Sequence, residues 1–254
     1  MSEGPASVEI LGCRLDCVDI GEATARILAL ARGDRPAQIV TLGTEMVVAA
    51  RRDLRFRSTL AASALNVCDT VGVLFAARRR GARIAGRVTG VELLERLCAA
   101  AAKEVLPIYL LGAAPGVAIE AARLLAERYP GLRVAGAGDG YFPVERSSAV
   151  AEEIARSGAR LLFVGLGSPR QEFWLAEHLA RSGAGAGIGV GGAFDALVGR
   201  VPRAPESWRR LNLEWLYRLL REPHRWRRQL ALPYFVALVL FDELRTSLGG
   251  RQHR

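Results

Sequence analysis

Residues 161–174 read Leu-Leu-Phe-Val-Gly-Leu-Gly-Ser-Pro-Arg-Gln-Glu-Phe-Trp, and this stretch decides the fold. The uninterrupted apolar run 161–164 predicts a strand that is buried on both faces of a parallel sheet. Gly165 and Gly167 follow it, and glycine lets the backbone turn tightly and approach a ligand closely. The stretch therefore predicts a buried strand that ends in a turn suited to ligand binding.

A helix is expected directly after this turn. Ser168 is a favourable N-cap residue, and Pro169 occupies the favoured first helical position. A helix that starts there directs its free N–H groups and positive dipole end toward the mouth of the sheet, where an anion such as a phosphate would bind. Arg170 and Gln171 stand in its first turn. The same pattern also fits a tight strand-to-helix connection without a ligand, so this stretch alone leaves both interpretations open.

The rest of the chain repeats the alternation of strands and helices. We expect a strand pair within residues 8–18, strands at 38–42, 64–68, 108–111, 132–135, 161–164 and 187–190, and helices at 23–32, 44–57, 71–80, 90–103, 115–128, 148–157 and 169–181. This order predicts an α/β fold, with a Rossmann-like parallel sheet and flanking helices. The expected core spans residues 1–199, with an N-terminal region (residues 1–105) and a Rossmann-like region (residues 106–199).

Composition narrows the class of protein. Half of the 254 residues are hydrophobic, which is typical of a globular protein. The four cysteines and three histidines form no recognisable zinc quartet, and Cys13 and Cys17 are too far apart for a redox Cys-x-x-Cys motif, so we expect reduced thiols in a cytosolic protein. The first residues are polar, which indicates no signal peptide. The longest apolar run, 230–241, contains Pro233 and is too short to span a bilayer, so it fits an interface or a core.

The positive charge is concentrated near the C-terminus. The net charge of +9 indicates anionic partners, which could be nucleic acid, lipid or a phosphorylated substrate. Residues 200–228 hold nine arginines against three glutamates, and Trp208, Leu211, Trp215 and Leu219 recur at helical spacing. We therefore expect residues 200–254 to form a basic amphipathic appendage that associates with a membrane. An RNA-binding segment or a solvated helix packed on the core also fits this pattern.

Two further positions suggest chemistry. Asp69 follows the expected strand 64–68, at the sheet edge where open α/β sheets bind their ligands; otherwise it simply caps the helix 71–80. The loop from Gly112 to Gly116 resembles a dinucleotide fingerprint, but it lacks the central glycine and carries Pro115 in the turn. A nicotinamide-dependent oxidoreductase is therefore the weaker alternative.

Several separated motifs together match one family. They are Thr41-Leu42-Gly43-Thr44-Glu45, Asp69, Gly86-Arg87-Val88-Thr89-Gly90, Gly138-Asp139-Gly140-Tyr141-Phe142, Gly165-Leu166-Gly167-Ser168-Pro169-Arg170-Gln171-Glu172, Gly191-Gly192-Ala193-Phe194-Asp195, Arg203-Ala204-Pro205 and Glu214-Trp215-Leu216-Tyr217-Arg218 with Pro223 and Arg225. Each motif alone is weak evidence, but their order and spacing are specific. From about residue 8 to residue 228, the chain resembles the WecG/TagA/CpsF glycosyltransferases.

The resemblance implies a reaction. It is the inverting, metal-independent transfer of a sugar from a UDP-sugar to a polyprenyl-diphosphate-linked sugar, at the cytoplasmic face of the membrane and without a cofactor. The implied partners are these two substrates and an anionic membrane surface, with no nucleic acid, and a homo-oligomer is possible. A non-catalytic accessory subunit of a glycan pathway is a further alternative.

The resemblance also assigns roles to residues. It makes Asp69 the catalytic base, with Asp195 as a reserve candidate that also fits a turn cap. The positions implied in substrate binding are Thr41, Gly43, Arg87, Gly167 and Gln171 in the core, and Arg218, Arg225 and Arg228 in the appendage, where they would meet the diphosphate. No metal ligand is implied. The chain has no Asp-x-Asp motif for a metal and diphosphate clamp, so we expect Arg87, Gln171 and the helix opening at Ser168 to take its place.

Three positions depart from the family pattern. Gly43 stands where the family usually has Asn, Thr70 follows Asp69 where Gly is usual, and Gly86 precedes Arg87 where Glu is usual. Loss of the Asn removes a side chain that could hydrogen-bond the donor sugar. N-acetylmannosamine specificity therefore does not follow from the resemblance, and the expected donors are an N-acetylmannosamine-type sugar, a glucose or a uronic acid.

Overall fold

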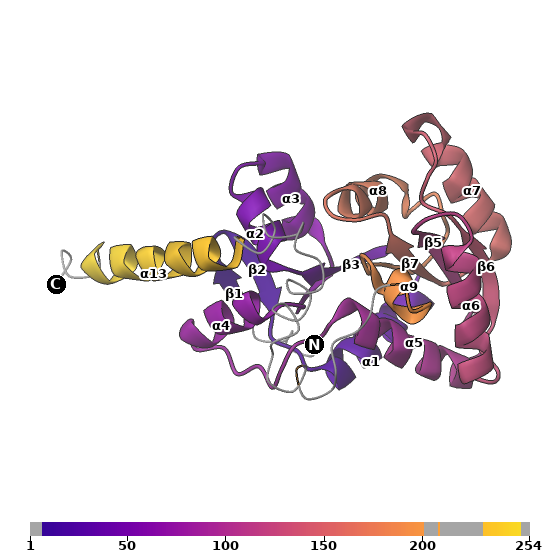
Figure 1. Ribbon diagram of the computed structural model, residues 1–254, viewed down its shortest axis with the longest axis horizontal. Helices are drawn as coiled ribbons and strands as arrows, with labels where there is room; N and C mark the ends of the chain where they lie inside the picture. Colours follow the sequence, from indigo (N-terminus) through magenta and orange to yellow (C-terminus); the bar gives the residue numbers. More distant parts are fainter. Residues whose placement is uncertain (1–6, 201–207, 209–230, 250–254) are drawn as a thin grey trace.

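The computed structural model describes residues 7–200, 208 and 231–249 (Figure 1). Its strands are β1 (Ser7–Ile10), β2 (Cys13–Asp16), β3 (Ala37–Leu42), β4 (Leu65–Cys68), β5 (Ile108–Gly112), β6 (Val134–Gly138), β7 (Leu161–Gly165) and β8 (Ala186–Gly189). Its helices are α1 (Ile20–Arg32), α2 (Thr44–Ala50), α3 (Leu54–Ala62), α4 (Val71–Arg79), α5 (Gly90–Glu104), α6 (Val117–Arg128), the 3-10 helix η1 (Val144–Arg146), α7 (Ser147–Ser157), α8 (Arg170–His178), α9 (Ala193–Leu197) and α13 (Ala231–Gly249).

Six strands form one parallel sheet in the order β4-β3-β8-β7-β5-β6, which confirms the predicted Rossmann-like α/β fold. The central strand β7 is buried along its whole length, as its apolar run predicts. β3, from the N-terminal region of the core, pairs with β8, from the Rossmann-like region. One sheet therefore joins both regions.

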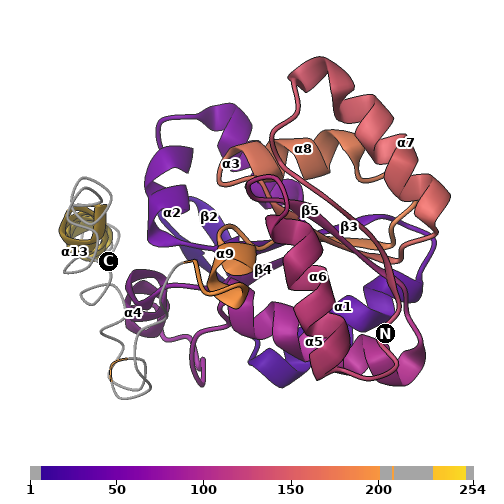
Figure 2. The same ribbon diagram turned by 45° about the vertical axis from the view of Figure 1, so that its right-hand side comes forward.

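Helices cover both faces of the sheet, and strand residues alternate between them. Leu161 and Phe163 point into the core under α1, α5, α6 and α9, whereas Leu162 and Val164 point into the core under α7 and α8. α2, α3 and α4 cover the second face at the β3–β4 end. Figure 2 shows α3, α8 and α7 on one side of the sheet and α1, α5 and α6 on the other.

Close packing of α8 on β8 explains the alternating glycines of this strand. A Cβ atom added to Gly187 would lie 2.5 Å from Cδ2 of Leu175, and one added to Gly189 would lie 2.6 Å from Nε2 of Gln171. Real Cβ atoms do not approach other heavy atoms so closely, so α8 can rest on the backbone of β8 only because these residues lack side chains.

Some helix starts differ from the sequence expectation. The helix expected at 44–57 is two helices, α2 and α3, because Asp53 starts a new one by accepting a hydrogen bond from the backbone N–H of Phe56. Gly43, and not Thr44, is the N-cap of α2. α8 begins at Arg170 with Pro169 as its N-cap and no side-chain cap, so the prediction that Ser168 caps this helix is wrong.

Two further elements, β6 and α9, also differ from the sequence expectation. β6 begins at Val134, two residues later than predicted, because Gly131 adopts a positive φ of 90° and the Leu132 N–H bonds back to the carbonyl of Tyr129. The short helix α9, which was not expected, follows the glycine turn at the end of β8.

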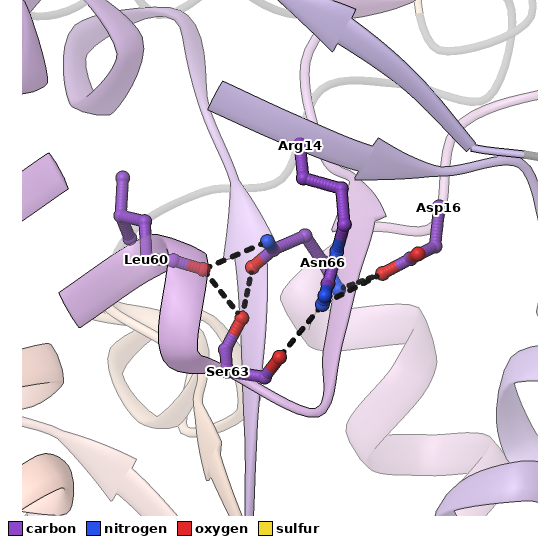
Figure 3. Close-up of polar contacts among 5 residues, drawn as sticks. All are labelled: Arg14, Asp16, Leu60, Ser63 and Asn66. Carbon is purple, nitrogen blue, oxygen red and sulfur yellow. Dashed lines mark hydrogen bonds and ion pairs between the residues drawn. The ribbon is translucent and has the colours of Figure 1, made fainter. Parts of the chain in front are cut away.

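The hairpin β1–β2 is attached to the edge strand β4 by a buried polar network (Figure 3). The Asp16 carboxylate accepts a hydrogen bond of 2.7 Å from the backbone N–H of Asn66 and pairs with Arg14 at 3.3 Å. Arg14 also donates to the carbonyl of Ser63. The Asn66 side chain in turn contacts Ser63 and the carbonyl of Leu60. This network supplies hydrogen-bond partners to the edge strand β4, which ends directly before Asp69.

We expect Asp16→Ala to lower the free energy of unfolding by about 1–3 kcal/mol, because it leaves a buried N–H of Asn66 without its acceptor. Urea unfolding followed by circular dichroism measures the change. Asp34→Ala, at an exposed aspartate, is the control and should change the free energy by less than about 0.5 kcal/mol. Equal losses in the two variants would contradict the structural role of the network.

The helix α13 packs on the core between α2 and α4. It buries Phe235 and Val239 there, and at its far end Glu243 pairs with Arg79 at 2.7 Å and Asp242 pairs with Arg80. Phe235 and Val239 of the apolar run thus lie in the core, one of its two predicted environments, whereas Tyr234, Leu240 and Phe241 are exposed. Within the described stretches of the chain, no helix is both long and apolar enough to cross a bilayer.

Candidate functional site

The candidate residues of the core gather at the carboxyl edge of the sheet, defined here as the edge at which the parallel strands end. Four neighbouring strands, β4, β3, β8 and β7, end there side by side. Asp69 follows β4, Gly43 follows β3 and Gly167 lies just after β7. The sequence placed Asp69 at this edge, and the structure confirms the location.

Asp69 is held by the N-terminus of a helix distant in the sequence. Its Oδ1 accepts a hydrogen bond of 3.0 Å from the backbone N–H of Gly90, the first residue of α5, and its own N–H donates to the carbonyl of Leu42. The N-cap of α4 is Thr70. Asp69 therefore does not cap the helix after its own strand; instead the positive end of α5 faces its carboxylate.

Arg87 lies half-buried in the loop before α5. The backbone N–H of its neighbour Val88 donates to the carbonyl of Cys68 at 2.6 Å, which fixes the loop against the end of β4. The pKa of Cys68 is raised to about 12, chiefly by burial and then by the charge of Asp69, whereas the charges of Arg87 and Arg78 lower it. The Val88 contact places the loop that carries Arg87 against Cys68, the residue before Asp69.

Two of the departures from the family pattern, Gly43 and Thr70, lie next to each other. A Cβ atom added to Gly43 would lie 3.5 Å from Cγ2 of Thr70, an ordinary contact distance, so a Cβ atom fits there. The Thr70 hydroxyl accepts a hydrogen bond from the backbone N–H of Thr44 at 3.1 Å and lies 2.8 Å from the Thr44 hydroxyl. The sequence gives no sign that these two departures are linked. In the structure they lie together and form one altered corner beside Asp69.

Thr41 and Gln171 both turn toward β8. The Thr41 hydroxyl donates to the carbonyl of Gly189 at 2.9 Å. Gln171 is only 3% exposed; its Oε1 accepts from the N–H of Gly191 at 3.1 Å, and its Nε2 donates to Oε1 of Glu172 at 2.7 Å. These two predicted binding residues are thus brought together, and both define the shape of the end of β8.

Arg170 contacts the loop after β6, whereas Gly167 lies in an open turn. Arg170, expected at the anion site, instead donates to the carbonyls of Gly140 and Phe142 at 3.0 Å each and stacks on the Phe142 ring. It therefore fastens the loop after β6. Gly167 is exposed with a positive φ of 77°, and no atom lies within 4 Å of where its Cβ would be, so this turn is open. The reserve candidate Asp195 lies on α9.

The loop that resembles a dinucleotide fingerprint is closed by backbone contacts. The N–H of Ala113 donates to the carbonyl of Gly165 at 3.0 Å, and the N–H of Gly140 donates to the carbonyl of Ala113 at 2.9 Å. A Cβ atom on Gly112 would lie 2.4 Å from the oxygen of Gly165. These contacts favour a structural turn over a pyrophosphate cradle.

The predicted appendage residues Arg218, Arg225 and Arg228 lie outside the described residues. In residues 7–200, 208 and 231–249, no group of three or more His, Cys, Asp or Glu side chains is arranged to bind a metal ion. The residue that sequence reasoning missed is Glu172, which is 1% exposed. Its signals in the sequence were its place as the last residue of the motif 165–172 and its position next to Gln171 in the first turn of a helix.

Comparison with known proteins agrees with this arrangement. The model of the Glycosyl transferase WecG/TagA/CpsF family matches residues 8–249. An N-acetylglucosaminyldiphosphoundecaprenol N-acetyl-beta-D-mannosaminyltransferase of Bacillus subtilis (strain 168) is 35% identical over 207 residues, which cover 82% of this chain and 80% of the relative. The protein with the same name in Bacillus spizizenii is 34% identical over 210 residues, with 83% and 81% covered. The chain therefore belongs to the WecG/TagA/CpsF family of glycosyltransferases.

Proposed function

We propose that this protein transfers a sugar from a UDP-sugar to a polyprenyl-diphosphate-linked sugar, with inversion at the anomeric carbon and without a metal ion. The observation that carries the proposal is the Asp69 carboxylate, held by the N–H of Gly90 at the carboxyl edge of the sheet. The names of the two Bacillus relatives support an acceptor of this lipid-diphosphate class.

The chemistry of inversion explains why a carboxylate is needed. A base must take the proton of the acceptor hydroxyl from within about 3 Å, on the face of the sugar opposite the leaving group. We assign this role to Asp69. Negative charge grows on the departing UDP, and we assign its stabilisation to Arg87 and to the helix N-termini that meet at this edge.

The remaining binding roles belong to the same proposal. Thr41, Gly43, Gly167 and Gln171 would shape the UDP-sugar site. Residues 200–254 would form the basic appendage that meets an anionic membrane on its cytoplasmic face, with Arg218, Arg225 and Arg228 at the acceptor diphosphate. The altered corner at Gly43 and Thr70 lies beside Asp69. We propose that the donor is an N-acetylmannosamine-type sugar, a glucose or a uronic acid.

A panel of UDP-sugars with a short-chain lipid-diphosphate-linked acceptor, analysed by mass spectrometry, tests the proposal. We expect one donor to give a product that is larger by one sugar residue, with unchanged yield in EDTA and with an inverted anomeric centre by NMR. A yield that EDTA abolishes would contradict metal independence. UDP binding without transfer to any acceptor would instead favour an accessory subunit.

A further inference from the structure

Glu172 combines deep burial with incomplete hydrogen bonding. It lies in the first turn of α8 and is 1% exposed. Its Oε1 accepts from Nε2 of Gln171 at 2.7 Å, whereas its Oε2 is buried and has no hydrogen-bond partner among the described residues. Burial raises the pKa of Glu172, and the side chains of Gln171 and Ser168 oppose this effect. A buried carboxyl group is unfavourable for stability, and packing alone would be better served by an apolar side chain.

The contacts around Glu172 fix the Gln171 amide in one orientation. Only the amide nitrogen can donate to Glu172, and only the amide oxygen can accept from the N–H of Gly191. Gly189 leaves room for both side chains, since a Cβ atom there would lie 2.6 Å from Nε2 of Gln171 and 3.1 Å from Oε1 of Glu172. Gln38 on β3 also donates to the backbone carbonyl of Glu172 at 3.0 Å.

The turn fixed in this way is next to Asp69. Gly191 directly follows Val190, and a Cβ atom on Gly90 would lie 3.1 Å from the carbonyl oxygen of Val190. Gly90 is the residue whose N–H holds Asp69. No atom lies within 4 Å of where a Cβ of Gly191 or Gly192 would be, so the turn presents open backbone at the carboxyl edge.

From these contacts, we infer that Glu172 is a positioning residue of the transferase site. It holds the Gln171 amide so that the turn at Gly191 and Gly192 keeps its place beside Asp69. The inference rests on the proposed function, because the turn is taken to serve the sugar transfer proposed above. The contacts between Glu172, Gln171 and Gly191 do not depend on that function. Glu172 does not touch the substrate.

The decisive variant is Glu172→Met, which fills a similar volume without an acceptor. We expect kcat/KM for transfer to fall about tenfold. The melting temperature should change by only a few degrees, because removal of a buried carboxyl group offsets the loss of the acceptor for the buried Nε2 of Gln171. Glu172→Gln keeps an acceptor for Gln171 and should retain at least about a third of the wild-type kcat/KM. Glu177→Met, at an exposed glutamate of the same helix, is the matched control and should leave kcat/KM unchanged.

A double-mutant cycle with Gln171→Ala shows whether Glu172 acts through Gln171. In the Gln171→Ala background, Glu172→Met should cause little further loss. Hydrogen exchange of the Gly191 amide should become faster in both single variants. Additive kinetic losses, or Gly191 exchange that stays as slow as in the wild type, would overturn the inference. If the wild-type protein transfers no sugar, the proposed function fails, while the exchange measurement still decides the role of Glu172.

Discussion

Asp69→Asn is expected to fold like the wild type and to lose at least ~100-fold in kcat, the scale for removing a general base. The amide oxygen of asparagine can still accept the hydrogen bond from Gly90, so the local structure should persist. The amide cannot take a proton from the acceptor hydroxyl. Initial-rate kinetics with the preferred UDP-sugar measure the loss, and thermal unfolding verifies the fold.

Asp195→Asn is the matched control, because this carboxylate lies on α9, which follows the neighbouring strand β8. We expect it to keep most of the wild-type rate. Near-normal turnover of Asp69→Asn together with a large loss in Asp195→Asn would move the base to Asp195. A normal rate in both variants would exclude a base role for either carboxylate.

Gly90→Pro should reduce kcat about 30-fold, the equivalent of roughly 2 kcal/mol for a hydrogen bond to a charged group. Proline lacks the N–H that holds Asp69, and its Cδ would take the place of that hydrogen against Oδ1, so the carboxylate must shift; the backbone itself accepts proline here. Gly90 is the first residue of α5, where proline is tolerated, and Thr89 before it is extended, with φ −77° and ψ 149°, as the residue before a proline requires.

Gly90→Ala provides the control for this variant. It adds the same Cβ atom, 3.1 Å from the carbonyl oxygen of Val190, but keeps the N–H. We expect it to retain kcat within about threefold of the wild type. UDP binding, measured by calorimetry, should be similar in the two variants, because the loss concerns the base and not the nucleotide. Equal rates for the two variants would show that the hydrogen bond to Asp69 is unimportant for turnover.

The sequence predicted most strands and helices of this fold because apolar runs and helical spacing lie within short stretches of the chain. The apolar run 161–164 identifies a strand covered on both faces, and β7 is that strand. Asp69 could be placed at the carboxyl edge because it directly follows such a strand. The break between α2 and α3 was missed because the capping contact of Asp53 competes with a continuous helical pattern.

The features of the site that sequence reasoning missed depend on contacts between distant loops. Asp69 meets Gly90, 21 residues further along the chain, and no spacing rule predicts that pair. Arg170 looked like an anion ligand from its place in a first turn, but the carbonyls of Gly140 and Phe142 hold it. Glu172 at a helix start normally faces solvent, and Gly189 of β8 makes room for its burial.

The pairing of β3 with β8 has a consequence for how the enzyme matures. Thr41 and Gly189, which share a hydrogen bond across this seam, are 148 residues apart in the chain. On the ribosome, β3 and β4 must wait for nearly the whole core to be synthesised before β8 can join them, and such long-range pairing is slow to form. Of the six strands that end at the carboxyl edge, β4 and β3 lie on one side of this seam and β8, β7, β5 and β6 on the other. A nascent chain that ends before β8 therefore carries Asp69 and Gln171 but cannot yet join the two sides of the sheet.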